Sequence, residues 1–438
     1  MKPSTNREAA AQQAITVSPT SRRRAMWASM LGSAVEFYEF TIYAYLAVVF
    51  APLFFPAGDV FASTLAALAV YVGGYVARPV GGLIFGALGD RFGRRPVLMT
   101  TIFLMGGAAS LVGLLPTYDQ IGVLAPILLV VLRLVQGFSA GGELTGALTF
   151  IVESAPPNRR AVYASLPALG VAIGLGLAAL VTAASSAIFT SSMESWGWRV
   201  PFLLSIPLTA ACFLLRRRLE DSPEFQAILA AKEVTRTPIR NALRGHLPDI
   251  LRITGLTVGL LAPSVLGKIY LGVYLIQTQK MSPVPVYATL GGLILLTAAL
   301  IPVMGRVSER IGRRPIALIG FTAYLLLSLP LYMFVASTTS LAAVAPAVLV
   351  FLAIEPFMAA AVYATVSELV PARTRYTATS IGFNLGTIVA VAGPYVCGQL
   401  ILMTNWDAAP GVWGIAGALL GLLTLAVTRE TRGEQLAR

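Results

Sequence analysis

The sequence GALGDRFGRRP, from Gly86 to Pro96, recurs half a chain later as GRVSERIGRRP, from Gly305 to Pro315. A second pair of stretches supports the first, since ESAPPNRR begins at Glu153 and SELVPARTR begins at Ser367. Two motifs that each recur after nearly the same number of residues indicate an internal duplication. The chain is therefore expected to consist of two halves with the same topology.

The composition indicates a protein that crosses a membrane many times. Of its 438 residues, 56% are hydrophobic and only 12% are charged, and the mean hydropathy is +0.77. A spanning helix needs about 20 mostly apolar residues, and this pattern predicts twelve spans, six in each half. They cover residues 25–53, 62–86, 97–116, 121–150, 161–190, 199–216, 250–279, 284–305, 316–336, 341–370, 376–403 and 408–428.

The basic residues predict the orientation of these spans. Basic residues at span ends are counted with the adjoining segment, Arg199 outside and Arg216 and Arg252 in the central loop. With the N-terminus taken as cytoplasmic, the inside segments then carry 27 of the 32 Lys and Arg residues, the outside segments carry two and the spans carry three. The positive-inside rule then places both termini in the cytoplasm. The net charge of +12 is explained by topology, so no nucleic-acid partner is expected.

The predicted organisation is an all-α membrane protein with two six-helix bundles, residues 25–216 and 250–428, joined by a cytoplasmic loop, 217–249. Cytoplasmic tails cover residues 1–24 and 429–438, and the first span shows no signal-peptide cleavage site. Cys212 and Cys397 fall in spans and His246 falls in the central loop, a pattern that indicates neither a disulfide, a metal site nor a cofactor.

Each copy of the repeated loop contains glycines for a tight turn, an Arg pair that anchors the cytoplasmic side, and one acid. We expect the acid to dock on the N-terminal end of a helix of the opposite half, or on its flanking arginines, and to hold the cytoplasmic side shut. The candidate partners are the Arg373/Arg375 region for Asp90 and the Arg159/Arg160 region for Glu309. The candidate gating and structural residues are Arg78, Gly86, Asp90, Arg91, Gly93, Arg94, Arg95, Glu309, Arg310, Arg313 and Arg314.

Charged side chains within the predicted spans are candidates for function, because an ionised group at the bilayer centre costs on the order of 2.5–3.5 kcal/mol. Depth along the helices predicts a central layer, with Arg133 near Glu36 or Glu39 and Lys268 near Glu355, and an inner layer, with Arg78 near Glu143. Pairing these groups leaves one carboxylate over, and that carboxylate can take a proton. The seven embedded charges are Glu36, Glu39, Arg78, Arg133, Glu143, Lys268 and Glu355.

Further motifs resemble the major facilitator superfamily, and more narrowly its metabolite:proton symporter subgroup, which includes carriers for citrate, 2-oxoglutarate, shikimate and proline/betaine. The resemblance covers nearly the whole chain. It is carried, besides the repeated loop, by EFYEF from Glu36, RPVGG from Arg78, RLVQGFSAGGE from Arg133, WGWRVPF from Trp196 and EDSPEF from Glu220. It implies alternating access around a cavity lined by spans one, four, seven and ten, and six of the seven embedded charges lie on those spans.

The predicted function is proton-coupled import of a small polar metabolite, an organic anion above all, by a functional monomer in the bacterial inner membrane. Arg133 and Lys268 are the candidate anion ligands, because an arginine fork grips a carboxylate with two hydrogen bonds. Tyr38, Gln136 and Glu355 complete the candidate substrate site, although Lys268 and Glu355 could instead pair with each other. The coupled proton is assigned to one of Glu36, Glu39 and Glu143.

Two rival transport functions stay open. A proton-driven exporter on the same fold is disfavoured because PALGVAIGLGLAAL, from Pro167, lacks the Gly-Pro-Gly signature of superfamily antiporters in span five. An osmolyte carrier is disfavoured by the short segment after the last span. A membrane-embedded enzyme would need a nucleophile with a base or a metal set, and the spans contain no histidine.

Overall fold

The computed structural model describes residues 19–56, 60–217, 238–372 and 374–434. The predicted N-terminal tail up to residue 18 and most of the predicted central loop, 218–237, lie outside the described residues. The described residues form helices and connecting turns with no strand. This arrangement satisfies the backbone hydrogen bonds within each segment, as a lipid environment requires.

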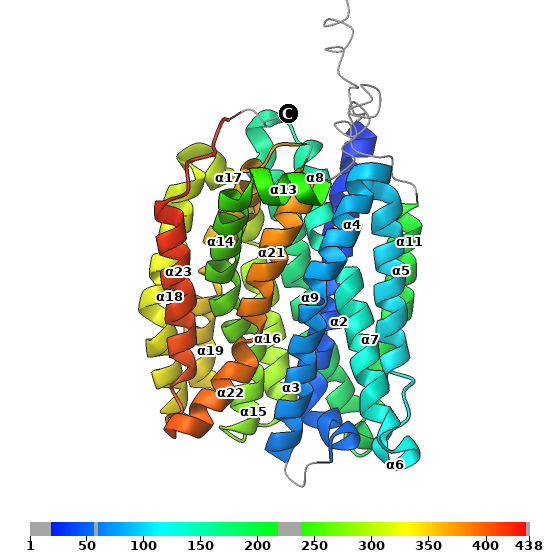
Figure 1. Cartoon of the computed structure of the whole chain (residues 1–438). Coiled ribbons are helices and arrows are strands. Elements are labelled where there is room, and N and C mark those ends of the chain that lie inside the picture. The colour runs from blue at the N-terminus through cyan, green and yellow to red at the C-terminus, as the bar shows by residue number, and fades with distance from the viewer. Residues whose placement is uncertain (1–18, 57–59, 218–237, 373, 435–438) are drawn as a thin grey trace, which may run out of the picture.

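The first half of the chain forms one bundle (Figure 1). Its elements are α2 (Pro19–Phe54), α3 (Val60–Val76), α4 (Arg78–Phe92), α5 (Arg94–Val112), α6 (Tyr118–Ile121), α7 (Leu124–Ala140), α8 (Glu143–Glu153), η1 (Pro157–Arg159), α9 (Arg160–Ile188), η2 (Met193–Gly197), α10 (Arg199–Leu203) and α11 (Ser205–Arg216).

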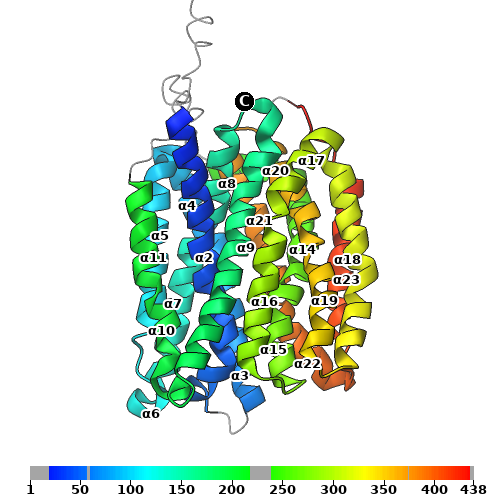
Figure 2. The ribbon, with the colours of Figure 1, turned by 180° about the vertical axis from the view of Figure 1, so that it is seen from behind.

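The second half forms the other bundle, seen from behind in Figure 2. Its elements are α13 (Pro238–Gly245), α14 (Leu247–Val265), η3 (Leu266–Tyr270), α15 (Leu271–Gln277), α16 (Pro283–Ala298), α17 (Ile301–Ile311), α18 (Arg313–Ala336), α19 (Leu341–Leu352), α20 (Glu355–Glu368), α21 (Arg375–Val391), α22 (Gly393–Thr404) and α23 (Pro410–Ala426). The short helix α13 lies within the predicted central loop.

Within the described ranges, eleven helical segments are long and apolar enough to cross a membrane, and they match the first eleven predicted spans to within a few residues at most ends. The twelfth predicted span appears as the 17-residue apolar helix α23, just short of that length. Spans two and eight differ most at their C-terminal ends, because α4 and α17 run through the repeated loops to Phe92 and Ile311. The turn that follows each helix is therefore a single glycine.

Several spans contain an interruption of the helix near mid-length, and sequence explains most of these. A proline stands in the first turn after the break in α4, α17, α20 and α22, where its missing N–H interrupts the hydrogen-bond ladder. Span four is interrupted instead at Gly141 and Gly142, between α7 and α8. These breaks place Arg78, Glu143 and Glu355 each at the first residue of a helix inside a span.

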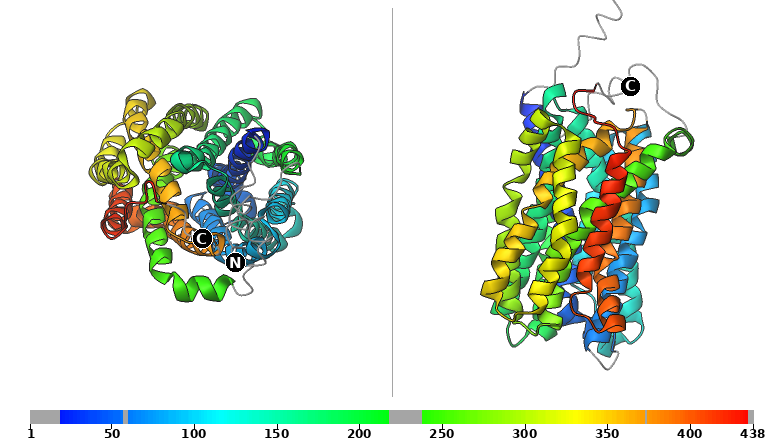
Figure 3. Two further views of the ribbon diagram at one scale, coloured as in Figure 1. Left: turned by 90° about the horizontal axis from the view of Figure 1, so that it is seen from above. Right: turned by 90° about the vertical axis from the view of Figure 1, so that its left-hand side faces the viewer.

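The two bundles pack side by side, as the view along the helices shows (Figure 3). Across the boundary, α9 packs along α16, and α4 packs along α21. The start of α2 and the segment that follows α23 lie at the same end of the molecule (Figure 1), which is called the terminal end below; the other is the far end. The repeated loops lie at the terminal end.

Candidate functional site

The embedded charges predicted from the sequence are all buried. Their exposed fractions are 0% for Glu36, Glu39, Arg133 and Glu143, 1% for Arg78, 2% for Lys268 and 7% for Glu355. Arg216, the last residue of α11, is also buried with 1% exposure and joins this embedded set through its contact with Glu143. The set therefore contains four cations and four carboxylates.

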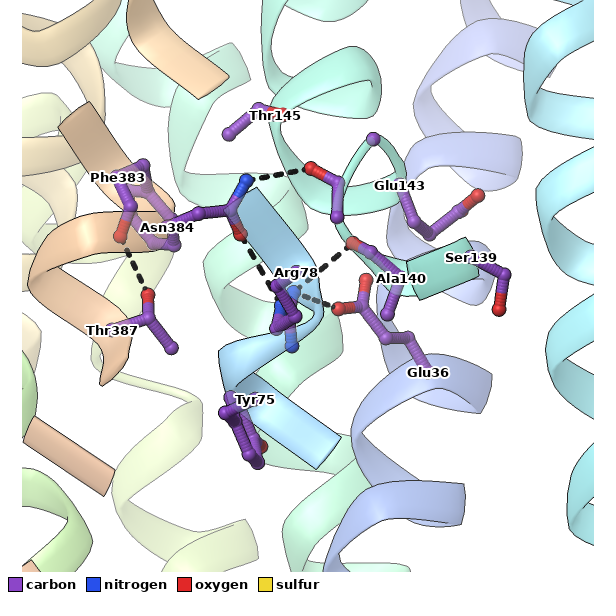
Figure 4. A network of polar contacts seen from close by, with 12 residues as sticks. Glu36, Tyr75, Arg78, Ser139, Ala140, Glu143, Thr145, Phe383, Asn384 and Thr387 are labelled. Atoms are coloured by element: carbon purple, nitrogen blue, oxygen red, sulfur yellow. Dashed lines mark hydrogen bonds and ion pairs between the residues drawn. The ribbon is translucent and has the colours of Figure 1, made fainter. Parts of the chain in front are cut away.

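Arg78 pairs with Glu36, and the pair lies at the boundary between the two halves (Figure 4). The Arg78 guanidinium also donates to the backbone carbonyl of Ala140 at 3.2 Å and to the side-chain carbonyl of Asn384, on α21 of the other half, at 3.3 Å. The pairing of Arg78 with Glu143 expected from the sequence is wrong. Depth along a helix gives the height of a side chain but not the direction in which it points.

Glu143 pairs instead with Arg216. Its second carboxylate oxygen accepts a hydrogen bond from the Thr101 hydroxyl at 2.7 Å, and Arg216 also donates to the carbonyl of Leu98 at 3.0 Å. Sequence reasoning missed Arg216 as an embedded charge because it is the last residue of predicted span six, so its charge is attributed to the cytoplasmic side. The unmatched carboxylate in the expected set of three cations and four acids was the signal that could have found it.

Lys268 and Glu355 form an ion pair, so the alternative in which they bind each other is the one the structure contains. Lys268 lies in η3, a π-helical turn between α14 and α15, and Glu355 is the first residue of α20. The N-terminal end of a helix favours a negative charge at that position. The backbone carbonyl of Lys268 accepts a hydrogen bond from the Tyr45 hydroxyl, which belongs to the other half.

Arg133 has no carboxylate partner among the residues that the structure describes, and its expected pairing with Glu36 or Glu39 is wrong. One nitrogen, Nη1, donates to the Gln136 side-chain carbonyl at 2.8 Å. The guanidinium carbon lies 4.8, 4.3 and 5.5 Å from the ring centres of Phe40, Tyr43 and Tyr71. Aromatic faces attract a cation, but they do not satisfy its N–H groups.

The Arg133 nitrogens Nε and Nη2 make no hydrogen bond to the described residues. The Gln136 side-chain nitrogen and the Tyr43 hydroxyl are likewise buried without a partner there. Buried polar groups are usually hydrogen-bonded, and an unmet donor costs free energy. This part of the N-terminal bundle therefore carries an excess of hydrogen-bond donors around one uncompensated positive charge.

Glu39 is the carboxylate left over. One of its oxygens accepts a hydrogen bond from the Thr209 hydroxyl of α11 at 3.0 Å, and the other is buried without a partner among the described groups. The remaining candidate, Tyr38, donates its hydroxyl to the carbonyl of Pro201 at 2.8 Å, so in this arrangement Tyr38 fastens α2 to α10.

At the terminal end, Glu309 docks on the opposite half as the sequence predicts. Its carboxylate accepts a hydrogen bond from the backbone N–H of Ala161, in the first turn of α9, at 2.5 Å. The same carboxylate lies 3.1 Å from Arg313, which also pairs with Glu368 at 3.2 Å. One carboxylate thus joins both halves near the repeated loop.

The other residues of the repeated loops fall into three groups. Gly93 and Gly312 have φ angles of 106° and 122°, which glycine adopts without strain, and they start α5 and α18. Gly86 lies close to the opposite half, since a Cβ there would be 3.4 Å from Thr377. The exposed loop cations are Arg91, Arg95, Arg310 and Arg314. Arg91 lies over the Phe92 ring, and Arg95 donates to the backbone carbonyl of Arg217. The backbone N–H of Arg314 donates to the Glu430 carboxylate.

The side chains of Asp90 and Arg94, and residue Arg373, lie outside what the structure describes. The neighbouring Arg375 pairs with Glu153 of the other half at 3.3 Å. The expected docking of Asp90 therefore stays a prediction.

Further contacts join the two halves near the embedded charges. Close to Arg78, the carbonyl of Gly141 accepts hydrogen bonds from Asn384 at 2.7 Å and from Ser380 at 3.0 Å. Toward the far end, Tyr287 donates to the carbonyl of Tyr45 at 2.7 Å. The two halves are thus joined by hydrogen bonds at more than one level.

Comparison with known proteins places this arrangement in a family. The sequence profile of the Major Facilitator Superfamily matches residues 26–394 and 253–438. The chain belongs to the major facilitator superfamily. Members of this superfamily are membrane transporters, so the chain is a multi-pass transporter and not an enzyme.

Three curated relatives from Escherichia coli (strain K12) resemble this superfamily member over almost its whole length. The inner membrane metabolite transport protein YhjE is 35% identical, and the match covers 95% of this chain and 96% of YhjE. The shikimate transporter is 33% identical, with 95% and 97% covered. The proline/betaine transporter is 30% identical, with 94% and 85% covered. The predicted subgroup of metabolite transporters is consistent with these relatives.

Among solved structures, the proton:xylose symporter XylE bound to 6-bromo-6-deoxy-D-glucose superposes with a TM-score of 0.75. It shares 15% sequence identity, and the superposition covers 95% of this chain and 98% of XylE. This similarity confirms the predicted major facilitator fold.

Proposed function

We propose that this transporter imports a small organic anion together with a proton, by alternating access, and that it works as a monomer. The names of its relatives support transport of a small metabolite, and XylE is a proton symporter with the same fold. The basic residues of the repeated loops favour a cytoplasmic location for the terminal end in a bacterial inner membrane.

The observation that carries this proposal is the charge balance of the buried groups. Glu36, Glu143 and Glu355 each pair with a cation, whereas Arg133 and Glu39 have no charged partner among the described residues. An uncompensated buried charge is costly, so a free energy gain is available to any anion that reaches Arg133. Glu39 avoids the same cost by carrying a proton.

Arg133 is suited to bind a carboxylate. Its Nε and Nη2 atoms, both without partners, form one edge of the guanidinium, and two parallel N–H donors match the two oxygens of a carboxylate. Further unpartnered donors come from Gln136, whose side-chain carbonyl binds Nη1, and from Tyr43, whose ring centre lies 4.3 Å from the guanidinium carbon. Tyr38 and the Lys268–Glu355 pair remain candidates for secondary contacts once the halves move.

Glu39 is suited to carry the coupled proton, in preference to Glu36 and Glu143. Protonation of Glu36 or Glu143 would leave Arg78 or Arg216 as a buried cation without its partner. Protonation of Glu39 leaves no such cation. Its position on α2, next to Phe40 of the Arg133 surroundings, lets a change at Glu39 act on the anion site through the helix.

Gating is proposed to follow from the contacts between the halves. Opening toward the terminal end must break the bond between Glu309 and Ala161 and the bonds from Asn384 and Ser380 to Gly141. Opening toward the far end must break those of Tyr45 with Lys268 and Tyr287. Arg78 and the loop residues hold the first set in place.

Uptake of radiolabelled shikimate and other small carboxylates into proteoliposomes tests the proposal. An inward proton gradient should drive accumulation, Arg133→Gln should abolish it, and exposed Arg306→Gln should not change it. Glu39→Gln should retain exchange of substrate across the membrane but lose accumulation driven by the proton gradient. Uptake that does not change when the proton gradient is collapsed would rule out symport. If an inward proton gradient instead drives substrate out of the proteoliposomes, the protein is an exporter.

A further inference from the structure

The charge balance of the buried groups also restricts the substrate. Resting on the proposed function, we infer that the anion bound at Arg133 carries a single carboxylate and no ammonium group: this transporter is selective for monocarboxylates over dicarboxylates and over zwitterionic amino acids.

A second carboxylate on the substrate would find no free cation. The charge of Arg78 is compensated by Glu36, and its guanidinium also donates to the carbonyl of Ala140 and to Asn384. The charge of Arg216 is compensated by Glu143, and Arg216 also donates to the carbonyl of Leu98. Only one nitrogen of each, Nη1 of Arg78 and Nε of Arg216, lacks a partner among the described residues, so neither offers a free two-nitrogen edge. A dicarboxylate would therefore either bury one charge without a partner or displace a carboxylate that the fold already supplies.

Lys268 offers no better partner. It is paired with Glu355, and its backbone is tied to the other half through Tyr45. Of the four embedded cations, Arg133 is thus the one without a carboxylate partner among the described residues, and its one free guanidinium edge binds one carboxylate.

An ammonium group next to the carboxylate would be repelled. In an α-amino acid the two groups are separated by one carbon atom, so an ammonium would lie close to the Arg133 guanidinium, which is a like charge. The walls around Arg133 are the rings of Phe40, Tyr43 and Tyr71. Glu36 pairs with Arg78, and Glu39 accepts a hydrogen bond from Thr209 on α11, so neither carboxylate pairs with Arg133.

The same walls favour a compact body with an apolar or ring surface. Ring faces pack against carbon, and the Tyr43 hydroxyl and the Gln136 nitrogen, both without partners, are the polar groups available to a hydroxyl on that body. Gly74 of α3 lies beside the binding edge: a Cβ there would lie 3.6 Å from both Nε and Nη2 of Arg133 and 3.1 Å from the backbone carbonyl oxygen of Arg133.

Binding to the full-length protein in detergent, measured by calorimetry, tests this inference. The probes are three compounds with a saturated six-membered ring: cyclohexanecarboxylate, cyclohexane-1,3-dicarboxylate and pipecolate, whose ring contains an ammonium nitrogen in place of one carbon. Shikimate, a hydroxylated ring monocarboxylate, is measured beside them. We expect the monocarboxylates to bind at least about 100-fold more tightly than the other two compounds, a ratio that corresponds to two tenfold steps in Kd.

Two pairs of variants connect the result to the site. Arg133→Gln should lose binding of the monocarboxylates, while Arg133→Lys keeps the charge and should retain weakened binding. Gly74→Ala should weaken binding about tenfold by placing a methyl group beside the arginine edge. Gly73→Ala, one residue away, has nothing within 4 Å of its Cβ and should bind as the wild type does.

The outcomes separate the two claims. Tighter binding of the dicarboxylate or of pipecolate, lost in Arg133→Gln, would overturn the selectivity for monocarboxylates and leave the anion site standing. Binding of any of these compounds that survives Arg133→Gln in folded protein, or no binding of any carboxylate, would overturn the proposed function itself.

Discussion

The carboxylate of Glu309 accepts a hydrogen bond from the backbone N–H of Ala161, across the boundary between the two halves, at 2.5 Å. The donor lies in the first turn of α9, where the helix dipole favours a negative charge, and the acceptor lies in the second copy of the repeated loop. A backbone group of one half is thus recognised by a loop residue of the other.

Glu309→Ala should weaken closure at the terminal end. A hydrogen bond to a charged group contributes about 1.5–3 kcal/mol, so its loss should shift the population toward the form open at that end by about tenfold or more. Glu309→Gln keeps an acceptor but not the charge and should lie between the wild type and Glu309→Ala. Spin-label distances between the halves at the terminal end report the population, and unchanged distances in Glu309→Ala would contradict the gating assignment.

The Lys268–Glu355 ion pair should contribute less to the stability of the fold than the cost of removing either partner alone suggests. Either Lys268→Met or Glu355→Leu leaves the other charge buried without its partner, and such changes typically cost about 3–5 kcal/mol, whereas replacing both partners by apolar residues is often close to neutral. We expect Lys268→Met/Glu355→Leu to recover most of the thermal stability in detergent that each single variant loses.

Transport by the same double variant decides between the two interpretations of the pair. If the pair is structural, the folded double variant should still take up monocarboxylates. A double variant that unfolds at the wild-type temperature but takes up none would assign Lys268 or Glu355 to the substrate site.

The spans and the docking of Glu309 could be predicted because each depends on a local property of the sequence. An apolar run must form a helix in lipid, and an acid at a duplicated loop position is attracted to a helix N-terminus. The helix ends were less predictable, since α17 continues through the polar loop to Ile311, where the apolar signal has already stopped.

The pairing of the embedded charges could be predicted only in part. Sequence position gives the height of each group, and this sufficed for Lys268 and Glu355, but it does not show which way Arg78 turns. Arg216 was hidden for another reason: it directly follows an apolar run, and a side chain in the last turn of a helix points back toward the N-terminus, here into the bundle. Both errors concern direction, which only the packed helices determine.

Close contact between α3 and α7 should depend on Gly137. A Cβ at this position would lie 1.6 Å from the carbonyl oxygen of Gly74, so even Gly137→Ala must push the two helices apart. We expect a loss of several degrees in the unfolding temperature and reduced ligand binding, because Arg133 lies one turn away on α7. Gly107→Ala, on exposed α5 surface with nothing within 4 Å, is the matched control, and equal behaviour of the two variants would refute the packing argument.

The contact between Glu430 and the start of α18 should depend on pH in a defined direction. Partial burial raises the pKa of Glu430, but hydrogen bonds from the backbone N–H groups of Arg313, Arg314 and Arg432 outweigh burial and hold the pKa below its usual range. A carboxyl whose pKa is lower in the folded than in the unfolded protein stabilises the fold fully above the unfolded pKa, about 4.3. That contribution is lost as the pH falls through the folded pKa.

The difference in unfolding temperature between the wild type and Glu430→Gln should therefore be constant near pH 7 and should shrink as the pH is lowered from about 5 to 3. Glu434→Gln is the control, because that carboxylate is exposed and lies 3.6 Å from Arg429, a pair of the kind that contributes little. A difference for Glu430→Gln that stays constant or grows toward pH 3 would show that the backbone donors of α18 do not hold the ionised carboxylate.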